Sequence, residues 1–138
     1  MENYITDELG NNAPIKKGLV VELTANTTLT REDSGKTFLI GTDALVITLP
    51  STFVGLEYTF INDGAAGNNI ITISPQAADG IAGTITLASS VVTRVGTVDI
   101  DLVNTKATST KGNSVKIVGT GVAGTGAWYI VSSTGIWA

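Results

Sequence analysis

Cysteine and histidine are both absent from this chain of 138 residues. Without cysteine the protein has no disulfide, no thiolate nucleophile and no zinc–thiolate site. Without histidine it also lacks the usual general base and the commonest transition-metal ligand. Carboxylate and serine–lysine chemistry remain, but no lysine follows a serine by three positions, as the S-x-x-K motif requires. We therefore expect a protein that is not an enzyme and that uses no metal and no cofactor.

Charged residues are scarce, at 14% of the chain, with 8 basic and 12 acidic side chains and a net charge of −4. The basic residues are spread along the sequence, whereas nucleic-acid binding needs clustered lysine and arginine. No apolar run reaches the roughly 20 residues of a membrane helix, and the N-terminus lacks the basic region and apolar core of a signal peptide. We expect a soluble product made in the cytoplasm, with no nucleic-acid partner and no membrane partner.

The hydrophobic fraction of 43% is high beside so few charges, because the surface of a small soluble monomer normally carries more charge. Two explanations remain open. The surface is either dominated by Thr, Ser, Asn and Gly, or it is partly covered by other subunits or by a larger shell.

Three short segments in the middle of the chain alternate between apolar and polar residues, which is the pattern of half-buried strands. They are residues 44–50, 56–62 and 69–75. Gly, Pro, Asn and Asp residues separate them, so the connections are predicted to be turns and not helices. This pattern predicts an antiparallel β-meander.

Similar short segments fill the rest of the chain, and none of them predicts a long helix. About ten short strands at regular spacing indicate an all-β fold. A chain of this length fits one domain and can bury about two thirds of its surface. We expect residues 18–138 to form a single-domain antiparallel β-sandwich or barrel, resembling a jelly roll. The other predicted strands are residues 19–23, 27–30, 36–40, 84–88, 90–94, 97–103, 114–118 and 127–131.

Residues 1–17 differ from the rest, with mixed charge and no sustained periodicity. They are predicted to form an extended N-terminal arm, and the alternative is a frayed terminus. Four apolar side chains favour an arm that becomes ordered on a partner, because a solvated tail does not need them. These candidate anchors are Tyr4, Ile5, Leu9 and Ile15.

Three polar motifs could carry chemistry, but each has a simpler interpretation. Residues 34–37 copy the end of a phosphate-binding loop, yet the first glycine is replaced by Thr30 and the following residues are strand-like, which favours a turn. Residues 62–64 and 67–69 could offer oxygen ligands to calcium, but they lack a spaced glutamate and are predicted to be turns.

Asp99 and Asp101 stand two residues apart on the predicted strand 97–103, so both should point to one face. Their carboxylates would lie ~7 Å apart, which suits a glycosidase pair or part of a calcium site. Alternating acidic residues are also the ordinary pattern on the solvated face of an amphipathic strand. The second interpretation is the preferred one.

Large aromatic residues gather near the C-terminus. Trp128 and Tyr129 are consecutive on a predicted strand, so they face opposite sides. Trp137 stands close to the end of the chain, where so large a ring must be docked. It docks either in its own core or against a neighbouring subunit, and buried aromatic anchors are typical of interfaces. Trp137 and Tyr129 are therefore our candidate subunit-interface residues.

Several of these segments also occur in a characteristic order. It runs through residues 47–55, 58–60, 71–73, 79–83, 128–132 and 135–137. In this order the chain resembles the β-rich virion surface proteins of tailed bacteriophages, which include capsid decoration (cement) proteins, head fibres and tail-fibre domains.

This resemblance implies a decoration protein on the capsid exterior, forming a homotrimer and binding the major capsid protein to stabilise the lattice. The alternative is a structural or receptor-binding domain of a tail or head fibre. The absence of heptads and internal repeats favours decoration, because fibres usually carry a repetitive shaft. A third, different hypothesis is a sugar-binding or sugar-cleaving module that uses Asp99 and Asp101.

Overall fold

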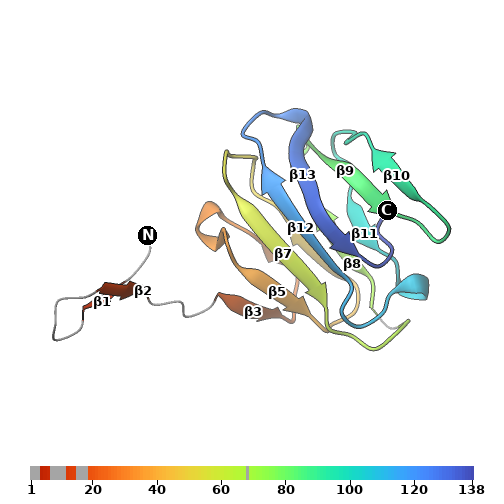
Figure 1. The fold of residues 1–138 in the computed structure, drawn as a ribbon, viewed down its shortest axis with the longest axis horizontal. Helices are drawn as coiled ribbons and strands as arrows, with labels where there is room; N and C mark the ends of the chain where they lie inside the picture. Colours follow the sequence, from red (N-terminus) through yellow and green to blue (C-terminus); the bar gives the residue numbers. More distant parts are fainter. Residues whose placement is uncertain (1–3, 7–11, 15–18, 68) are drawn as a thin grey trace.

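The computed structural model describes residues 4–6, 12–14, 19–67 and 69–138, which form a β-rich fold (Figure 1). Seven strands make the larger sheet, in the order β10 (Val91–Arg94), β9 (Asp79–Thr86), β13 (Gly124–Thr134), β12 (Ser114–Gly119), β7 (Glu57–Asn62), β5 (Thr37–Ile40) and β3 (Val20–Leu23). Four make the smaller sheet, in the order β11 (Leu102–Asn104), β8 (Ile71–Ser74), β6 (Leu45–Thr48) and β4 (Thr27–Thr28).

The remaining elements are short. Two single-turn 3₁₀ helices, η1 (Arg31–Asp33) and η2 (Lys106–Thr108), lie in connections between strands. Within the predicted arm, β1 (Tyr4–Thr6) and β2 (Asn12–Pro14) pair in antiparallel fashion. The candidate anchors Tyr4 and Ile5 belong to β1, whereas Leu9 and Ile15 lie outside the described residues.

From β3 to β9 the chain alternates between the two sheets, so each strand is followed by one in the opposite sheet. As a result β3, β5 and β7 lie side by side in parallel, and so do β4, β6 and β8. The last strands, β12 and β13, then insert between β7 and β9. Both sheets are therefore mixed, and the described strands do not close into a barrel.

The predicted antiparallel meander is wrong, because β6 pairs directly with β8 in parallel and β7 belongs to the other sheet. The antiparallel description of the whole domain is wrong for the same reason. A half-buried strand alternates in the same way whether the next strand lies beside it or across the core. The turn residues at 50–55 therefore carry the chain across the core instead of back along the same sheet.

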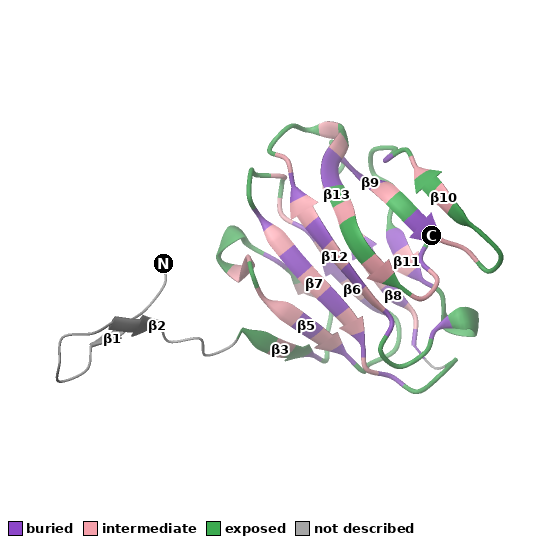
Figure 2. Ribbon diagram, in the orientation of Figure 1, coloured by how far each residue is buried: buried purple, intermediate pink, exposed green. Residues whose placement is uncertain are grey.

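The two sheets share one apolar core. Every second residue on β7 and β12 is buried, which Figure 2 shows as alternating purple and pink segments. The aromatic side chains pack together there. The rings of Phe38 and Phe60 stack at 5.6 Å, and those of Tyr58 and Trp128 lie 5.7 Å apart. Burial of one face of each sheet against this shared core is the main stabilising contribution.

A network of buried asparagines closes the core where β7 and β11 end. The side-chain Nδ2 of Asn62 donates to Oδ1 of Asn104 at 2.8 Å, and Nδ2 of Asn104 donates to the Ile136 carbonyl at 2.8 Å. Asn113 adds a hydrogen bond to Thr110. Because buried amides are costly when unpaired, this network fixes the position of the C-terminal segment.

Candidate interaction surfaces

Asp99 and Asp101 do not share a strand, because β11 begins only at Leu102. Asp99 adopts a left-handed conformation (φ 60) and its N–H donates to the Asp79 carbonyl at 3.0 Å. Arg94 holds this loop by donating to the carbonyls of Ile100 and Asp101. The predicted same-face carboxylate pair is therefore wrong, and both aspartates are exposed on a loop.

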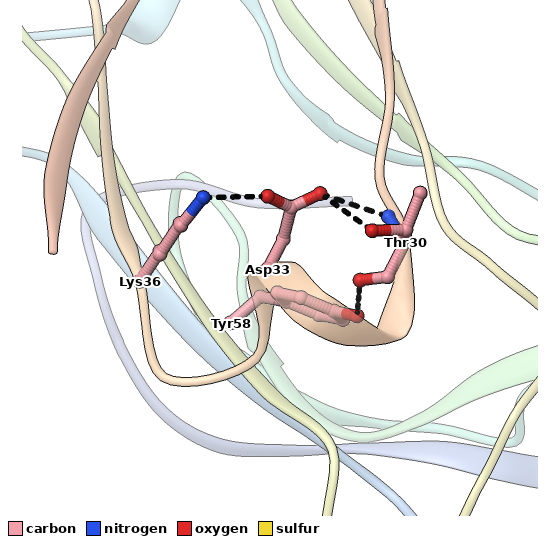
Figure 3. A network of polar contacts seen from close by, with 4 residues as sticks. All are labelled: Thr30, Asp33, Lys36 and Tyr58. Carbon is pink, nitrogen blue, oxygen red and sulfur yellow. Dashed lines mark hydrogen bonds and ion pairs between the residues drawn. The ribbon is translucent and has the colours of Figure 1, made fainter. Parts of the chain in front are cut away.

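Residues 34–36 form a turn after η1, and they are followed by the strand β5, which begins at Thr37, in place of a helix. Figure 3 shows the network around this turn. The Asp33 carboxylate accepts hydrogen bonds from Lys36 Nζ at 2.8 Å and from the Thr30 N–H at 2.9 Å. The lysine that resembles a phosphate ligand is thus held by Asp33, and the Tyr58 hydroxyl donates to the Thr30 carbonyl at 2.7 Å.

The same network changes two pKa values. Partial burial would raise the pKa of Asp33, but the hydrogen bonds from Lys36 and Thr30 outweigh it and lower that pKa below its usual value. Burial raises the pKa of Tyr58 to about 12, and the nearby negative charge of Asp33 adds to the effect. Both shifts follow from burial and from contacts around this turn.

The asparagine turn at residues 62–64 closes on itself, because Oδ1 of Asn62 accepts from the Gly64 N–H at 2.9 Å. Asp63 lies 3.2 Å from Lys111 Nζ in an ion pair. Within residues 4–6, 12–14, 19–67 and 69–138, no three acidic side chains come together in a way that could hold a metal ion. In this part of the chain, no helix has the length and apolar character to span a membrane.

The structure places the Trp137 ring in the core of its own chain, where the side chain is 0% exposed. Its Nε1 donates to the Thr134 carbonyl at 3.0 Å. A fully buried ring has no surface left for a subunit contact, so in this structure Trp137 follows the own-core alternative. Tyr129 is different, since it is 46% exposed on the outward face of β13 while Trp128 is buried inside.

Tyr129 belongs to an apolar strip on the outer face of the larger sheet. Val131 follows it on the same strand and is also exposed, and Val118 lies opposite it on β12. We refer to Val118, Tyr129 and Val131 as the β13 strip. It is a surface that another protein or another copy of the chain could cover.

Four connections meet at one end of the molecule, near the start of β7, β9 and β13 (Figure 1). Asp79 joins two of them, because its carboxylate accepts from the Thr52 N–H at 2.8 Å and its carbonyl accepts from Asp99. Thr52 Oγ1 accepts from the Gly121 N–H at 3.1 Å, which adds the third connection. The Gly124 N–H donates to the Ala78 carbonyl and ties in the fourth.

These connections carry six of the eleven large apolar side chains that are exposed in the described part of the chain. We call this set the apolar end, and its members are Phe53, Val54, Val95, Val98, Ile100 and Val122. Val54 is 68% exposed and Val122 is 70% exposed, and the two segments touch, since the space beside Gly121 is filled by Val54. This is the largest concentration of exposed apolar side chains among the residues described.

Charges of both signs border the apolar end, and among them the carboxylates of Asp99 and Asp101 are exposed while the Arg94 guanidinium is held by backbone carbonyls. Asp99 and Asp101 are exposed beside Val98 and Ile100, whereas the guanidinium of Arg31 lies over the Phe53 ring at 4.0 Å. At the opposite ends of the strands the charges are paired, as in the ion pair between Lys106 and Asp43.

The sequence analysis missed the apolar end, although the sequence contains a signal for it. Valine stands beside glycine in three predicted turns, at 54–55, 95–96 and 121–122. Turns are normally polar, so an apolar side chain beside a turn glycine points to an exposed apolar surface.

No protein-family model matches the chain, and no curated protein matches it.

Proposed function

We propose that this protein is a non-enzymatic capsid decoration protein of a tailed bacteriophage. It binds the outside of the head, forms a trimer and stabilises the capsid lattice through the major capsid protein. One observation carries the proposal: a chain with few charges exposes large apolar side chains on two separate surfaces, the β13 strip and the apolar end. A decoration protein needs two such surfaces, one for its own copies and one for the shell.

Each surface has a role in the proposal. The β13 strip is the self-association surface, with Tyr129 as its aromatic anchor, because exposed aromatic rings are favoured at interface centres. The two sheets with their shared core form a sandwich, which leaves the outer face of the larger sheet free for this contact. The apolar end is the surface that contacts the shell. The N-terminal arm adds a second contact with the capsid through Tyr4, Ile5, Leu9 and Ile15. No cofactor, nucleic acid or membrane takes part.

The proposal is tested with undecorated heads of the phage that encodes the chain. We expect the full-length protein to bind in proportion to the number of capsid subunits and to raise the temperature at which heads break. A chain lacking residues 1–17 should fold and bind more weakly. Binding of only a few copies, at one vertex or on the tail, would replace decoration by the fibre alternative. Absence of binding to any part of the particle would refute both.

A self-association variant separates the two surfaces. Tyr129→Ser should lower the oligomeric state in sedimentation experiments, because it removes the ring at the centre of the β13 strip. Val91→Ser is the matched control, since Val91 is also exposed on the larger sheet but lies on β10. Equal oligomeric states for both variants would rule out the β13 strip as the self-association surface.

A further inference from the structure

The apolar end presents a substantial surface to solvent. Its six side chains are 39–75% exposed, and gatherings of exposed apolar side chains are often functional. Hydrogen bonds to Asp79 and Thr52 hold three of the connections in place. The surface is therefore organised before any partner arrives, which lowers the entropic cost of binding.

A second copy of the chain is a poor occupant for this surface. A two-fold contact centred on Asp99 and Asp101 would bring the same carboxylates of two copies together, and like charges at an interface are costly.

An anionic lipid surface is also a poor occupant. Lipid-binding ends normally carry several exposed lysine or arginine side chains around their apolar tips. Here the exposed charges beside Val98 and Ile100 are the carboxylates of Asp99 and Asp101, and the one nearby guanidinium, that of Arg94, is half-buried and donates to the Ile100 and Asp101 carbonyls. The chain as a whole has a net charge of −4. The guanidinium of Arg31 lies over the Phe53 ring.

We propose that the apolar end binds a protein surface with an apolar recess bordered by lysine or arginine side chains. Val54 and Val122 occupy the centre of this contact, and Asp99 and Asp101 face the basic border. This inference rests on the proposed function, within which the recess belongs to the outer surface of the capsid. It assigns the apolar end to the shell and leaves the β13 strip for contacts between copies.

The test uses undecorated heads as the probe and the double variant Val54→Ser/Val122→Ser. Loss of two exposed valines from an interface centre should weaken binding roughly 10- to 100-fold. Val91→Ser is the control, because Val91 is 66% exposed and lies outside the apolar end. Thermal unfolding of each variant verifies that the fold is retained, as expected for exposed positions.

A second variant tests the charge. Asp99→Asn/Asp101→Asn keeps the size of both side chains, and asparagine tolerates the left-handed conformation of Asp99. We expect association with heads to slow roughly 3- to 10-fold at low salt, with a smaller dependence of the rate on ionic strength. An unchanged association rate with an unchanged salt dependence would overturn the proposal that the recess has a basic border.

The outcomes separate this inference from the proposed function. If the unmodified protein binds no heads, the proposed function fails and the inference fails with it. If the unmodified protein and the valine double variant bind heads equally well, only the inference is overturned. It is also overturned if the double variant loses its oligomeric state in sedimentation, or if the unmodified protein floats with anionic or zwitterionic vesicles and the double variant does not.

Discussion

Val103 and Ala138 exchange both backbone hydrogen bonds, at 2.7 and 3.0 Å, so Ala138 covers the edge of β11. The neighbouring Trp137 N–H donates to the Thr86 carbonyl on β9, which belongs to the other sheet. The C-terminal segment therefore links the two sheets across one side of the core. An edge that is covered in this way is not open to pairing with another chain.

The first prediction concerns Trp137. Trp137→Ala should lower the free energy of unfolding by about 3–5 kcal/mol, because it removes the largest class of core side chain and leaves a cavity. Urea unfolding followed by circular dichroism measures the change. Val91→Ser is the control and should stay within about 1 kcal/mol, since Val91 is 66% exposed and lies outside both proposed contact surfaces. A stable Trp137→Ala variant that no longer associates would instead support the subunit-interface role.

The second prediction concerns backbone strain. Ala44 is an exposed non-glycine residue in the left-handed region, at φ 61. Ala44→Gly should stabilise the protein by roughly 0.5–1 kcal/mol, because glycine adopts this conformation without steric cost. Gly35→Ala is the reverse experiment, at φ +86 with no atom within 4 Å of the added methyl group. It should destabilise by roughly 1 kcal/mol. Melting temperatures that move in the same direction for both would contradict this explanation.

The third prediction concerns the buried amides. Asn104→Ala leaves Nδ2 of Asn62 and the carbonyl of Ile136 without their partner. The expected loss is roughly 2–4 kcal/mol, because each orphaned buried group costs its desolvation. Asn26→Ala is a matched control, since Asn26 accepts one exposed hydrogen bond from Val46. It should cost less than about 1 kcal/mol in chemical denaturation. Equal losses of unfolding free energy in the two variants would show that the buried network contributes no more to stability than an exposed hydrogen bond.

The fourth prediction concerns pH. The pKa of Asp33 is lowered in the folded protein, so between that value and the ordinary value of 3.8 the unfolded chain binds more protons than the folded one. The stability contributed by Asp33 is present above pH 3.8 and is lost as the pH falls through its folded pKa. Asp33→Asn should lower the melting temperature at pH 6 and flatten its decrease between about pH 5 and 3.

Asp43 provides the comparison for this experiment. Its pKa is lowered too, mainly by hydrogen bonds from Lys106 and the Ile70 N–H. The melting temperature of Asp33→Asn should therefore still decrease at acid pH. The decrease should be smaller in the double variant that also carries Asp43→Asn. An identical pH dependence for the unmodified protein and the double variant would mean that neither network contributes to acid stability.

The positions and inner faces of most strands could be predicted from the sequence. Residues such as Phe60 and Ile73 alternate with polar neighbours, and alternation depends only on which face is buried. Strand pairing could not be predicted in this way, because the turn between β6 and β7 has the same residues whether it folds back or crosses the core. The strand expected at 97–103 is reduced to Leu102–Asn104, since Asp99 turns the chain in a left-handed conformation.

The candidate surfaces, too, could be predicted from the sequence only in part. The sequence predicts that Trp128 and Tyr129 face opposite sides of one strand, and the structure shows that Tyr129 is the exposed one. The position of Trp137 depends on its backbone hydrogen bond to Thr86, which comes from distant pairing that no local pattern reports. The apolar end depends on four connections meeting at Asp79, which is also a property of the complete fold.

The insertion of β12 and β13 between β7 and β9 determines when the protein can fold during synthesis. A ribosome must release residues 114–134 before the middle of the larger sheet exists, so a shorter nascent chain leaves the edges of β7 and β9 unpaired. Pairing over such sequence separations folds slowly and exposes strands that aggregate. Production of this protein should therefore respond strongly to lower temperature and to chaperones, and chains that stop before β12 should accumulate as insoluble material.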